Sequence, residues 1–247
     1  MIAMITADLQ RMLRRRGLMI SGCATPAVIT IAIAVVLIVL RSRSPADHPD
    51  IGGAGLLEFG MLIGVVATIF GSLIGATIGA EDSVNGTLRY LLLTGVTRLQ
   101  LFLQRIPVVV ISAIALFLPA FVLLVLFTVA LPHPTASTPS ASAVAAALLA
   151  IALPTTVYAL IAYGVGNVVR STGGAIAIAL GLNLIGLQVI AAISLALPAL
   201  EPWMLPIAMA RITNGGDSSI LVAIAVTLIW VGAFLAGGLF RALRSEA

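Results

Sequence analysis

The apolar run from Leu18 to Leu40 contains no charged residue and is long enough to cross a bilayer as a single helix. At about 1.5 Å per residue, its roughly 23 residues exceed the hydrocarbon thickness of about 30 Å. Similar runs fill most of the sequence, which is 61% hydrophobic and only 9% charged, with a mean hydropathy of +1.20. A soluble protein of 247 residues could not cover its surface with so few charges. The sequence therefore predicts an all-α integral membrane protein.

Six apolar segments are predicted to span the membrane, within a single transmembrane domain over residues 1–247. These segments are residues 18–40, 56–78, 106–131, 143–169, 173–197 and 219–240. Before them, residues 1–17 have apolar side chains at helical spacing followed by arginines, which predicts an amphipathic helix at the interface. A cleaved signal peptide is the alternative, but no convincing small-residue cleavage site precedes Arg41.

Residues 198–216 separate the last two predicted spans and contain three prolines, Trp203 and Arg211. This stretch is too short and too broken to cross the bilayer. It predicts a re-entrant or interfacial elbow on the outer side, with Trp203 at the level of the headgroups.

All 13 basic residues are arginines, and their distribution predicts the orientation. Six spans place both termini on one side. If that side is the cytoplasm, ten arginines lie inside, and only Arg41, Arg43 and Arg211 lie outside. This split follows the positive-inside rule and predicts cytoplasmic termini in the cell membrane. The arginines flank apolar runs and form no patch that would bind nucleic acid.

Residues 81–105 form the longest charged interruption, and they are predicted to lie at the cytoplasmic surface. Inserting Arg89 and Arg98 would cost roughly 6 kcal/mol at about 3 kcal/mol each. The seven leucines, Val96 and Phe102 favour insertion by roughly 0.5 kcal/mol each, which offsets only about 4 to 5 kcal/mol of that cost. Part of this segment should therefore be helical, with a leucine face and a polar face.

The residues that common enzymes and carriers need are missing from the predicted spans. Without lysine, the chain cannot form a P-loop or a Schiff base. Both histidines, His48 and His133, fall in predicted outer loops, so a catalytic or metal site in the membrane is not expected. The single cysteine, Cys23, cannot form an internal disulfide. We therefore expect no catalytic residue, metal site or cofactor on this chain.

A few uncharged polar residues do lie inside the predicted spans. They include Thr68 and Ser72 in the second predicted span, and Asn183 and Gln188 in the fifth. Buried amides and hydroxyls in lipid either form interhelical hydrogen bonds or line a polar path, and both interpretations stay open. The second span also has glycines at intervals of four, which would fit packing within the chain or a dimer interface.

The segment at residues 81–105 also carries a recognisable pattern. At Glu81 and Asp82, then Gly86-Thr87-Leu88-Arg89, Leu91-Leu92 and Val96-Thr97-Arg98, the sequence resembles exporter-type ABC transporter permeases of the type-2 family. The six-span plan, the amphipathic start and the elbow before the last span fit as well. Gly95 departs from the pattern, because proline is usual at that position.

The resemblance implies a coupling helix between the second and third spans that docks on a separate ATP-binding subunit, which would hold ATP and Mg²⁺. The residues expected to dock are Glu81, Asp82, Gly86, Thr87, Leu88, Arg89, Leu92 and Arg98. Carboxylates favour a helix N-terminus, and Thr87 and Thr97 are suited to cap the helices that follow them. A dimer of permease protomers, identical or paralogous, is implied too, with the substrate path near Thr68, Ser72, Asn183 and Gln188.

Two functions are consistent with these features. The first is the permease subunit of an ATP-driven exporter, moving an amphiphilic substrate such as a drug, lipid or peptide. The second is a membrane scaffold that recruits a cytoplasmic partner and transports nothing. A P-loop ATPase encoded in a neighbouring reading frame would favour the first.

Overall fold

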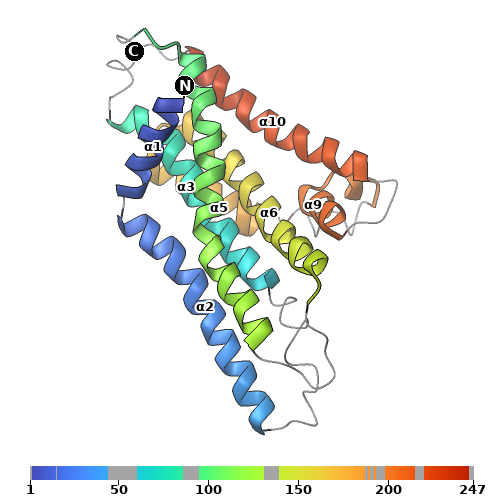
Figure 1. Cartoon of the computed structure of the whole chain (residues 1–247). Helices are drawn as coiled ribbons and strands as arrows, with labels where there is room; N and C mark the ends of the chain where they lie inside the picture. The colour runs from blue at the N-terminus through green and yellow to red at the C-terminus, as the bar shows by residue number, and fades with distance from the viewer. Residues whose placement is uncertain are drawn as a thin grey trace.

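The computed structural model describes residues 2–14, 16–43, 60–85, 95–130, 139–186, 198–214 and 220–244, together with positions 189 and 192. Within these ranges every regular element is a helix and no strand occurs. The α-helices are α1 (Ile2–Arg14), α2 (Arg16–Arg43), α3 (Gly60–Asn85), α5 (Arg98–Ala130), α6 (Ala141–Val169), α7 (Thr172–Leu180), α9 (Leu205–Asn214) and α10 (Ile220–Arg244). A π-helical turn, η2 (Gly181–Gly186), extends α7, and a 3₁₀ helix, η3 (Pro198–Trp203), precedes α9 (Figure 1).

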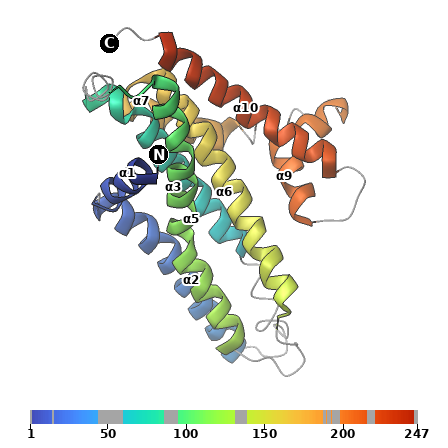
Figure 2. The ribbon, with the colours of Figure 1, turned by 45° about the horizontal axis from the view of Figure 1, so that its top comes forward.

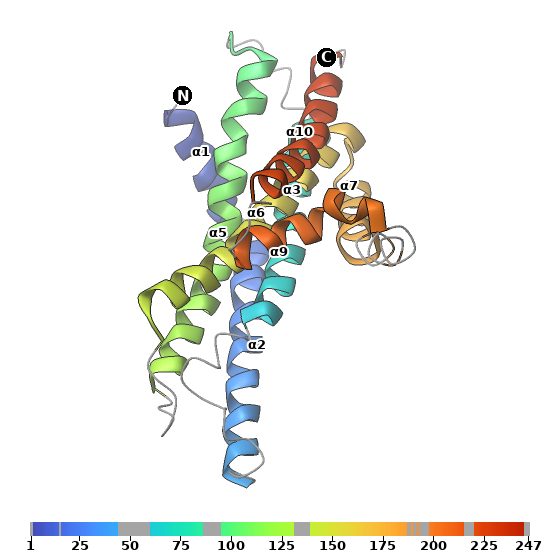
Figure 3. The same ribbon diagram turned by 90° about the vertical axis from the view of Figure 1, so that its right-hand side faces the viewer.

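Five of these helices, α2, α3, α5, α6 and α10, are long and apolar enough to cross a membrane. The chain is therefore an all-α, multi-pass membrane protein. Each of the five overlaps one of the predicted spans. The remaining predicted span, residues 173–197, overlaps only the shorter apolar helix Thr172–Gly186, and most of the rest of that stretch lies outside the described residues. α1 and the last turn of α10 lie at the same end of the bundle (Figures 1 and 3).

The surface segment predicted at residues 81–105 is shorter than expected, because both of its ends belong to long helices. α3 continues to Asn85, so Glu81 lies in its last turns. α5 begins at Arg98, well before the predicted start of the third span at residue 106. Partners on neighbouring helices pair with Glu81 at one end and with Arg98 and Arg105 at the other. This pairing removes much of the penalty that unpaired charges carry near a bilayer.

The glycines of α3 pack within the chain, against α6. A β-carbon added to Gly75 would lie 1.9 Å from the carbonyl oxygen of Ala159, and Gly71 and Gly79 approach carbonyls of α6 at 2.8 and 2.4 Å by the same measure. Only glycine permits so close an approach of two backbones. The glycine stripe thus forms a seam of closely approaching backbones between α3 and α6.

Candidate functional site

The helix α1 lies against α5 at one end of the bundle (Figure 2). Charged side chains of α1, α3 and α5 meet there. The apolar side of α1 supplies Met12, which is 2% exposed, to a core cluster that contains Ile78, Phe102 and Val108. Leu9 packs against the same cluster. The predicted N-terminal helix is present as α1, and Leu9 and Met12 of its apolar face pack on protein.

Arg105 in α5 joins α1 to α3. Its Nε lies 3.7 Å from Oδ2 of Asp8, and its Nη1 donates a hydrogen bond of 3.3 Å to the carbonyl oxygen of Ile78. The Arg105 side chain is only 7% exposed and that of Asp8 is 22% exposed. A guanidinium removed from water to this extent requires such partners, because burying an unpaired charge is costly.

A second ion pair joins α1 to α3. Nε of Arg11 lies 3.6 Å from Oε1 of Glu81, whose side chain is 6% exposed. The four side chains Asp8, Arg11, Glu81 and Arg105, here called the anchoring cluster, surround a cavity of about 10 Å³, roughly the room for one water molecule. Their formal charges sum to zero. The anchoring cluster therefore holds α1 on α3 and α5 without leaving a net buried charge.

Arg98, the first residue of α5, contacts the other end of the chain. Its Nη1 donates hydrogen bonds of 3.3 Å to the carbonyl oxygens of Ala242 and Leu243, in the last turn of α10. The last carbonyls of a helix lack partners within the helix and carry its negative dipole end, so a guanidinium suits them. Arg98 thus links the start of α5 to the end of α10.

The turn into α5 has the geometry that its residues favour. Gly95 has φ = 82°, a left-handed conformation that glycine adopts without strain. Gln100 N–H donates to Thr97 Oγ1 at 3.2 Å, and Thr97 N–H donates to Gln100 Oε1 at 3.1 Å. This reciprocal pair is a capping box, and the prediction that Thr97 caps the helix is confirmed.

Of the predicted docking residues, only Glu81 and Arg98 have described side chains, and both contact other helices of this chain. Asp82 lies in α3, and nothing further is described of its side chain. The remaining five, Gly86, Thr87, Leu88, Arg89 and Leu92, lie outside the described residues. Their docking role stays a prediction.

The structure brings two of the predicted path residues together. Asn183 Nδ2, in η2, donates a hydrogen bond of 3.2 Å to Ser72 Oγ in α3, and both residues are buried. Ser72 Oγ in turn donates to the carbonyl oxygen of Thr68 at 2.8 Å, and the Thr68 hydroxyl bonds the carbonyl oxygen of Val65. The interhelical hydrogen bond is therefore present, at a π-helical turn, a feature frequent at functional sites. Gln188 lies outside the described residues.

Further buried polar contacts were not predicted. The Tyr163 hydroxyl donates to the carbonyl oxygen of Phe102 at 3.0 Å, and the two rings lie 5.0 Å apart, which ties α6 to α5. Asp8 was also missed as a partner for Arg105. A single acidic residue in an otherwise basic amphipathic helix was the available signal for that pair.

Comparisons with protein-family models, with curated proteins and with solved structures find no match.

Proposed function

We propose that this chain is the membrane-spanning permease subunit of an ATP-driven ABC exporter that moves an amphiphilic substrate. The observation that carries the proposal is the pattern from Glu81 to Arg98, which begins in the last turns of α3 and ends at the first residue of α5. A multi-pass helical bundle whose sequence holds no lysine needs a separate subunit to hydrolyse ATP. The pattern is where that subunit would dock.

The contacts on both sides of the connection support a coupling role. On one side, Glu81 pairs with Arg11 of α1, and on the other, Arg98 bonds the end of α10. Arg105 ties α5 back to α1 and α3. A force applied between residues 86 and 97 would therefore reach four helices through short polar contacts, since packed elements transmit displacement as rigid bodies.

The path residues fit the same scheme. Moving α3 and α5 relative to α7 would strain or break the hydrogen bond between Ser72 and Asn183. The freed amide and hydroxyl would then need a new partner, because unpaired polar groups are costly in the membrane. A polar group of the substrate would serve as that partner.

The remaining parts of the proposal follow from the arginine distribution and the resemblance. α1 and the end of α10 lie in the cytoplasm, and the protein resides in the cell membrane. Two permease protomers, identical or paralogous, assemble with two ATP-binding subunits that hold ATP and Mg²⁺. The fifth predicted span, residues 173–197, would bring the number of crossings to six.

The test is co-expression of the chain with a P-loop ATPase encoded in a neighbouring reading frame, followed by purification and reconstitution. We expect the ATPase to co-purify and to drive ATP-dependent movement of a fluorescent amphiphile. Leu88→Asp with Leu92→Asp should abolish co-purification while leaving the yield of folded permease unchanged. Arg241→Glu is the matched control, because Arg241 is exposed at the same end of the bundle, outside the pattern.

If the ATPase still co-purifies with the variant that carries Leu88→Asp and Leu92→Asp, the docking role is wrong. Association without any ATP-dependent movement would favour the scaffold function.

A further inference from the structure

Interior prolines interrupt three of the long helices: Pro26 in α2, Pro119 in α5 and Pro154 in α6. Proline has no backbone N–H, so each of them leaves the carbonyl oxygen four residues earlier without its usual partner in the helix. These carbonyls belong to Gly22, Ala115 and Ala150. Each proline is therefore a position where its helix can bend.

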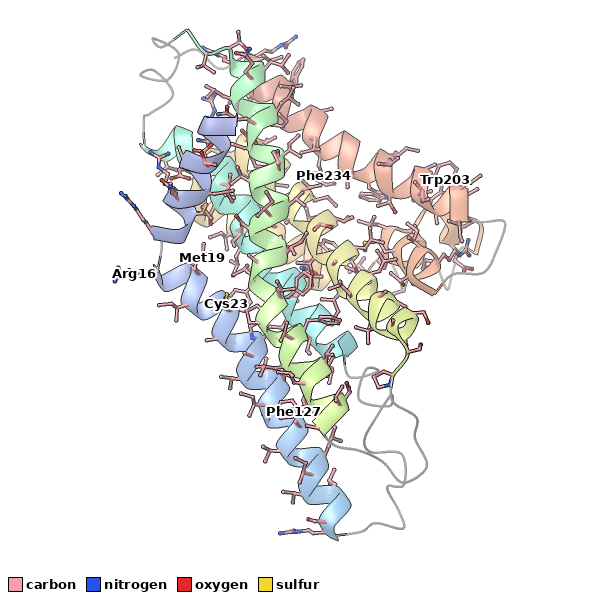
Figure 4. The ribbon with its side chains drawn as sticks, viewed as in Figure 1. Arg16, Met19, Cys23, Phe127, Trp203 and Phe234 are labelled. Carbon is pink, nitrogen blue, oxygen red and sulfur yellow. The ribbon has the colours of Figure 1, made fainter. Side chains whose placement is uncertain are left out.

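The prolines of α2 and α5 lie at the same level of the bundle. Both helices run toward the end where Phe127 lies (Figure 4). Sγ of Cys23 donates a hydrogen bond of 3.8 Å to the carbonyl oxygen of Ala115, the oxygen that Pro119 leaves without a helical partner. Pro26 follows Cys23, and Pro119 follows Ala115, by about one helical turn. The two interruptions are therefore neighbours on facing helices.

The proline of α6 lies close to this level, next to α3. Cδ1 of Phe70 in α3 lies 3.4 Å from the position that a β-carbon on Gly22 would take. The next residue of α3, Gly71, approaches α6, because a β-carbon added there would lie 2.8 Å from the carbonyl oxygen of Thr155, which follows Pro154. The helix α3 itself contains no proline. The three prolines thus lie around the middle of a helix that has no such interruption.

Buried threonine hydroxyls favour bending in α2 and α6. Thr30 Oγ1 donates a hydrogen bond of 2.8 Å to the carbonyl oxygen of Pro26, and Thr155 Oγ1 donates one of 2.7 Å to that of Ile151. Both threonines are buried. A hydroxyl that bonds the carbonyl four residues earlier competes with the backbone and often bends the helix.

The apolar core divides at the same level. One cluster, on the side of the anchoring cluster, contains Ile74 of α3 and Ala159 of α6 among its buried members. The other, on the side away from it, contains Ala67 of α3 and Ile151 of α6. The prolines therefore lie close to the boundary between two apolar clusters.

The close approach of α3 and α6 also ends here. β-carbons added to Gly71 and Gly79 would lie 2.8 and 2.4 Å from carbonyl oxygens of α6. On the other side of Gly71, β-carbons added to Gly64 and Gly60 would meet α6 only at the side chain of Ile151, at 3.8 and 3.5 Å. A side chain can change its rotamer, whereas touching backbones hold two helices together.

We propose that the three prolines form a hinge, at which the parts of α2, α5 and α6 beyond them change their angle to α3. These distal segments are residues 27–43, 120–130 and 141–153. The glycine seam and the anchoring cluster hold the opposite parts of α3, α5 and α6 together. The hinge opens the end of the bundle where Phe127 lies, while α1 stays bound at the other end. It does not depend on the exporter function.

Double electron–electron resonance tests the hinge in the full chain, in phosphatidylcholine nanodiscs and diluted with unlabelled protein. Cys23→Ser removes the single cysteine and keeps a hydrogen-bond donor at that position. One label pair, Leu62→Cys in α3 and Leu126→Cys in α5, reports a distal segment. The other pair, Ile20→Cys in α2 and Leu103→Cys in α5, reports the opposite side of the hinge. All four residues are at least 50% exposed, so the labels displace no core side chain.

We expect the distances of the distal pair to spread about twofold more widely than those of the other pair, and Pro119→Ala to remove the difference. Pro107→Ala is the matched control and should leave the spread unchanged, because Pro107 is also inside α5 but lies away from the hinge. Pro154→Ala, read from labels at Leu62 and Leu149, repeats the test in α6, so the result does not depend on the folding of one variant.

Equal spreads in the two pairs would overturn the hinge. A wide spread that persists in both Pro119→Ala and Pro154→Ala would overturn it as well. So would a spread that Pro107→Ala narrows as much as Pro119→Ala does, because the motion would then arise elsewhere in the bundle.

Discussion

The hydroxyl of Tyr158 is buried and forms no hydrogen bond among the described residues. It lies in α6 within the cluster that also holds Leu205 and Met209 of the elbow. Buried hydroxyls almost always have a partner, because leaving one unpaired costs about 1 to 3 kcal/mol. The unpaired hydroxyl of Tyr158 therefore lowers the stability of the folded protein.

Tyr158→Phe should raise the thermal stability of the purified protein, by an amount equivalent to about 1 kcal/mol or more. The substitution keeps the ring in the cluster and removes only the unsatisfied oxygen. The measurement is the midpoint of thermal unfolding in detergent. Tyr163→Phe is the matched control, and its midpoint should fall, since the Tyr163 hydroxyl bonds the carbonyl oxygen of Phe102. A lower midpoint for Tyr158→Phe would show that the hydroxyl has a partner.

Residue types alone suggested some of the polar contacts. Thr97 was predicted to cap α5, because a threonine just before an apolar run favours that position. For Ser72 and Asn183 the sequence left two interpretations open, and only the fold shows that they meet across two helices. No spacing rule relates residues 111 positions apart, so this pair could not be derived from sequence.

At the scale of elements, the seam between α3 and α6 depends on glycines that have no room for a side chain. Gly75→Ala would place a β-carbon 1.9 Å from the carbonyl oxygen of Ala159, and backbone cannot move as a flexible side chain does. We expect this variant to separate the two helices and to destabilise the protein by about 3 kcal/mol or more, at the upper end of overpacking effects.

Gly232→Ala in α10 is the control, because nothing lies within 4 Å of the β-carbon it would add. Alanine favours helix over glycine by about 1 kcal/mol, so this variant should be neutral or stabilising. Thermal unfolding of both variants in detergent checks the pair. Equal midpoints would mean that the close approach of α3 and α6 is absent.

The anchoring cluster makes a second prediction at this scale. Arg105→Ala should destabilise the protein by about 3 kcal/mol, because it leaves Asp8 partly buried without its guanidinium. In a double-mutant cycle with Asp8→Ala, the loss should be smaller than the sum of the single losses, by about 0.5 to 3 kcal/mol. Arg14→Ala, on the exposed side of α1, should change stability by less than about 0.5 kcal/mol. Additive losses would contradict the ion pair.

Helix ends that carry charges were the hardest to predict from sequence. The helices α2, α6 and α10 overlap the predicted segments 18–40, 143–169 and 219–240, but α2 and α10 also include the arginines that follow those segments. The ends of α3 and α5 carry Glu81 and Arg105, which hydropathy assigns to the surface. Tertiary partners on α1 keep both residues helical and buried, and hydropathy contains no term for such partners.

At the scale of the whole molecule, arginines that were predicted to share one side of the membrane gather at one end of the bundle. Ten of the 13 arginines were assigned to one side from the sequence. In the structure, α1, the start of α5 and the end of α10 converge at one end, where Arg11, Arg98 and Arg105 form contacts within the chain. Arg14 and Arg16 are exposed beside them. This end therefore carries both paired and exposed arginines, and the positive-inside rule predicts that such an end lies in the cytoplasm.

Both α1 and the end of α10 are therefore predicted to lie in the cytoplasm. In a Cys23→Ser background, Arg14→Cys and Arg244→Cys should resist a membrane-impermeant maleimide added to intact cells and react after permeabilisation. Ser137→Cys, in the predicted outer loop, should react in intact cells. If Arg14→Cys reacts from outside and Arg244→Cys does not, the number of crossings is odd, and the stretch between α7 and the elbow does not complete a span. If both react from outside, the positive-inside assignment is inverted, and a coupling role for the connection between α3 and α5 fails with it, because that connection would then face away from ATP.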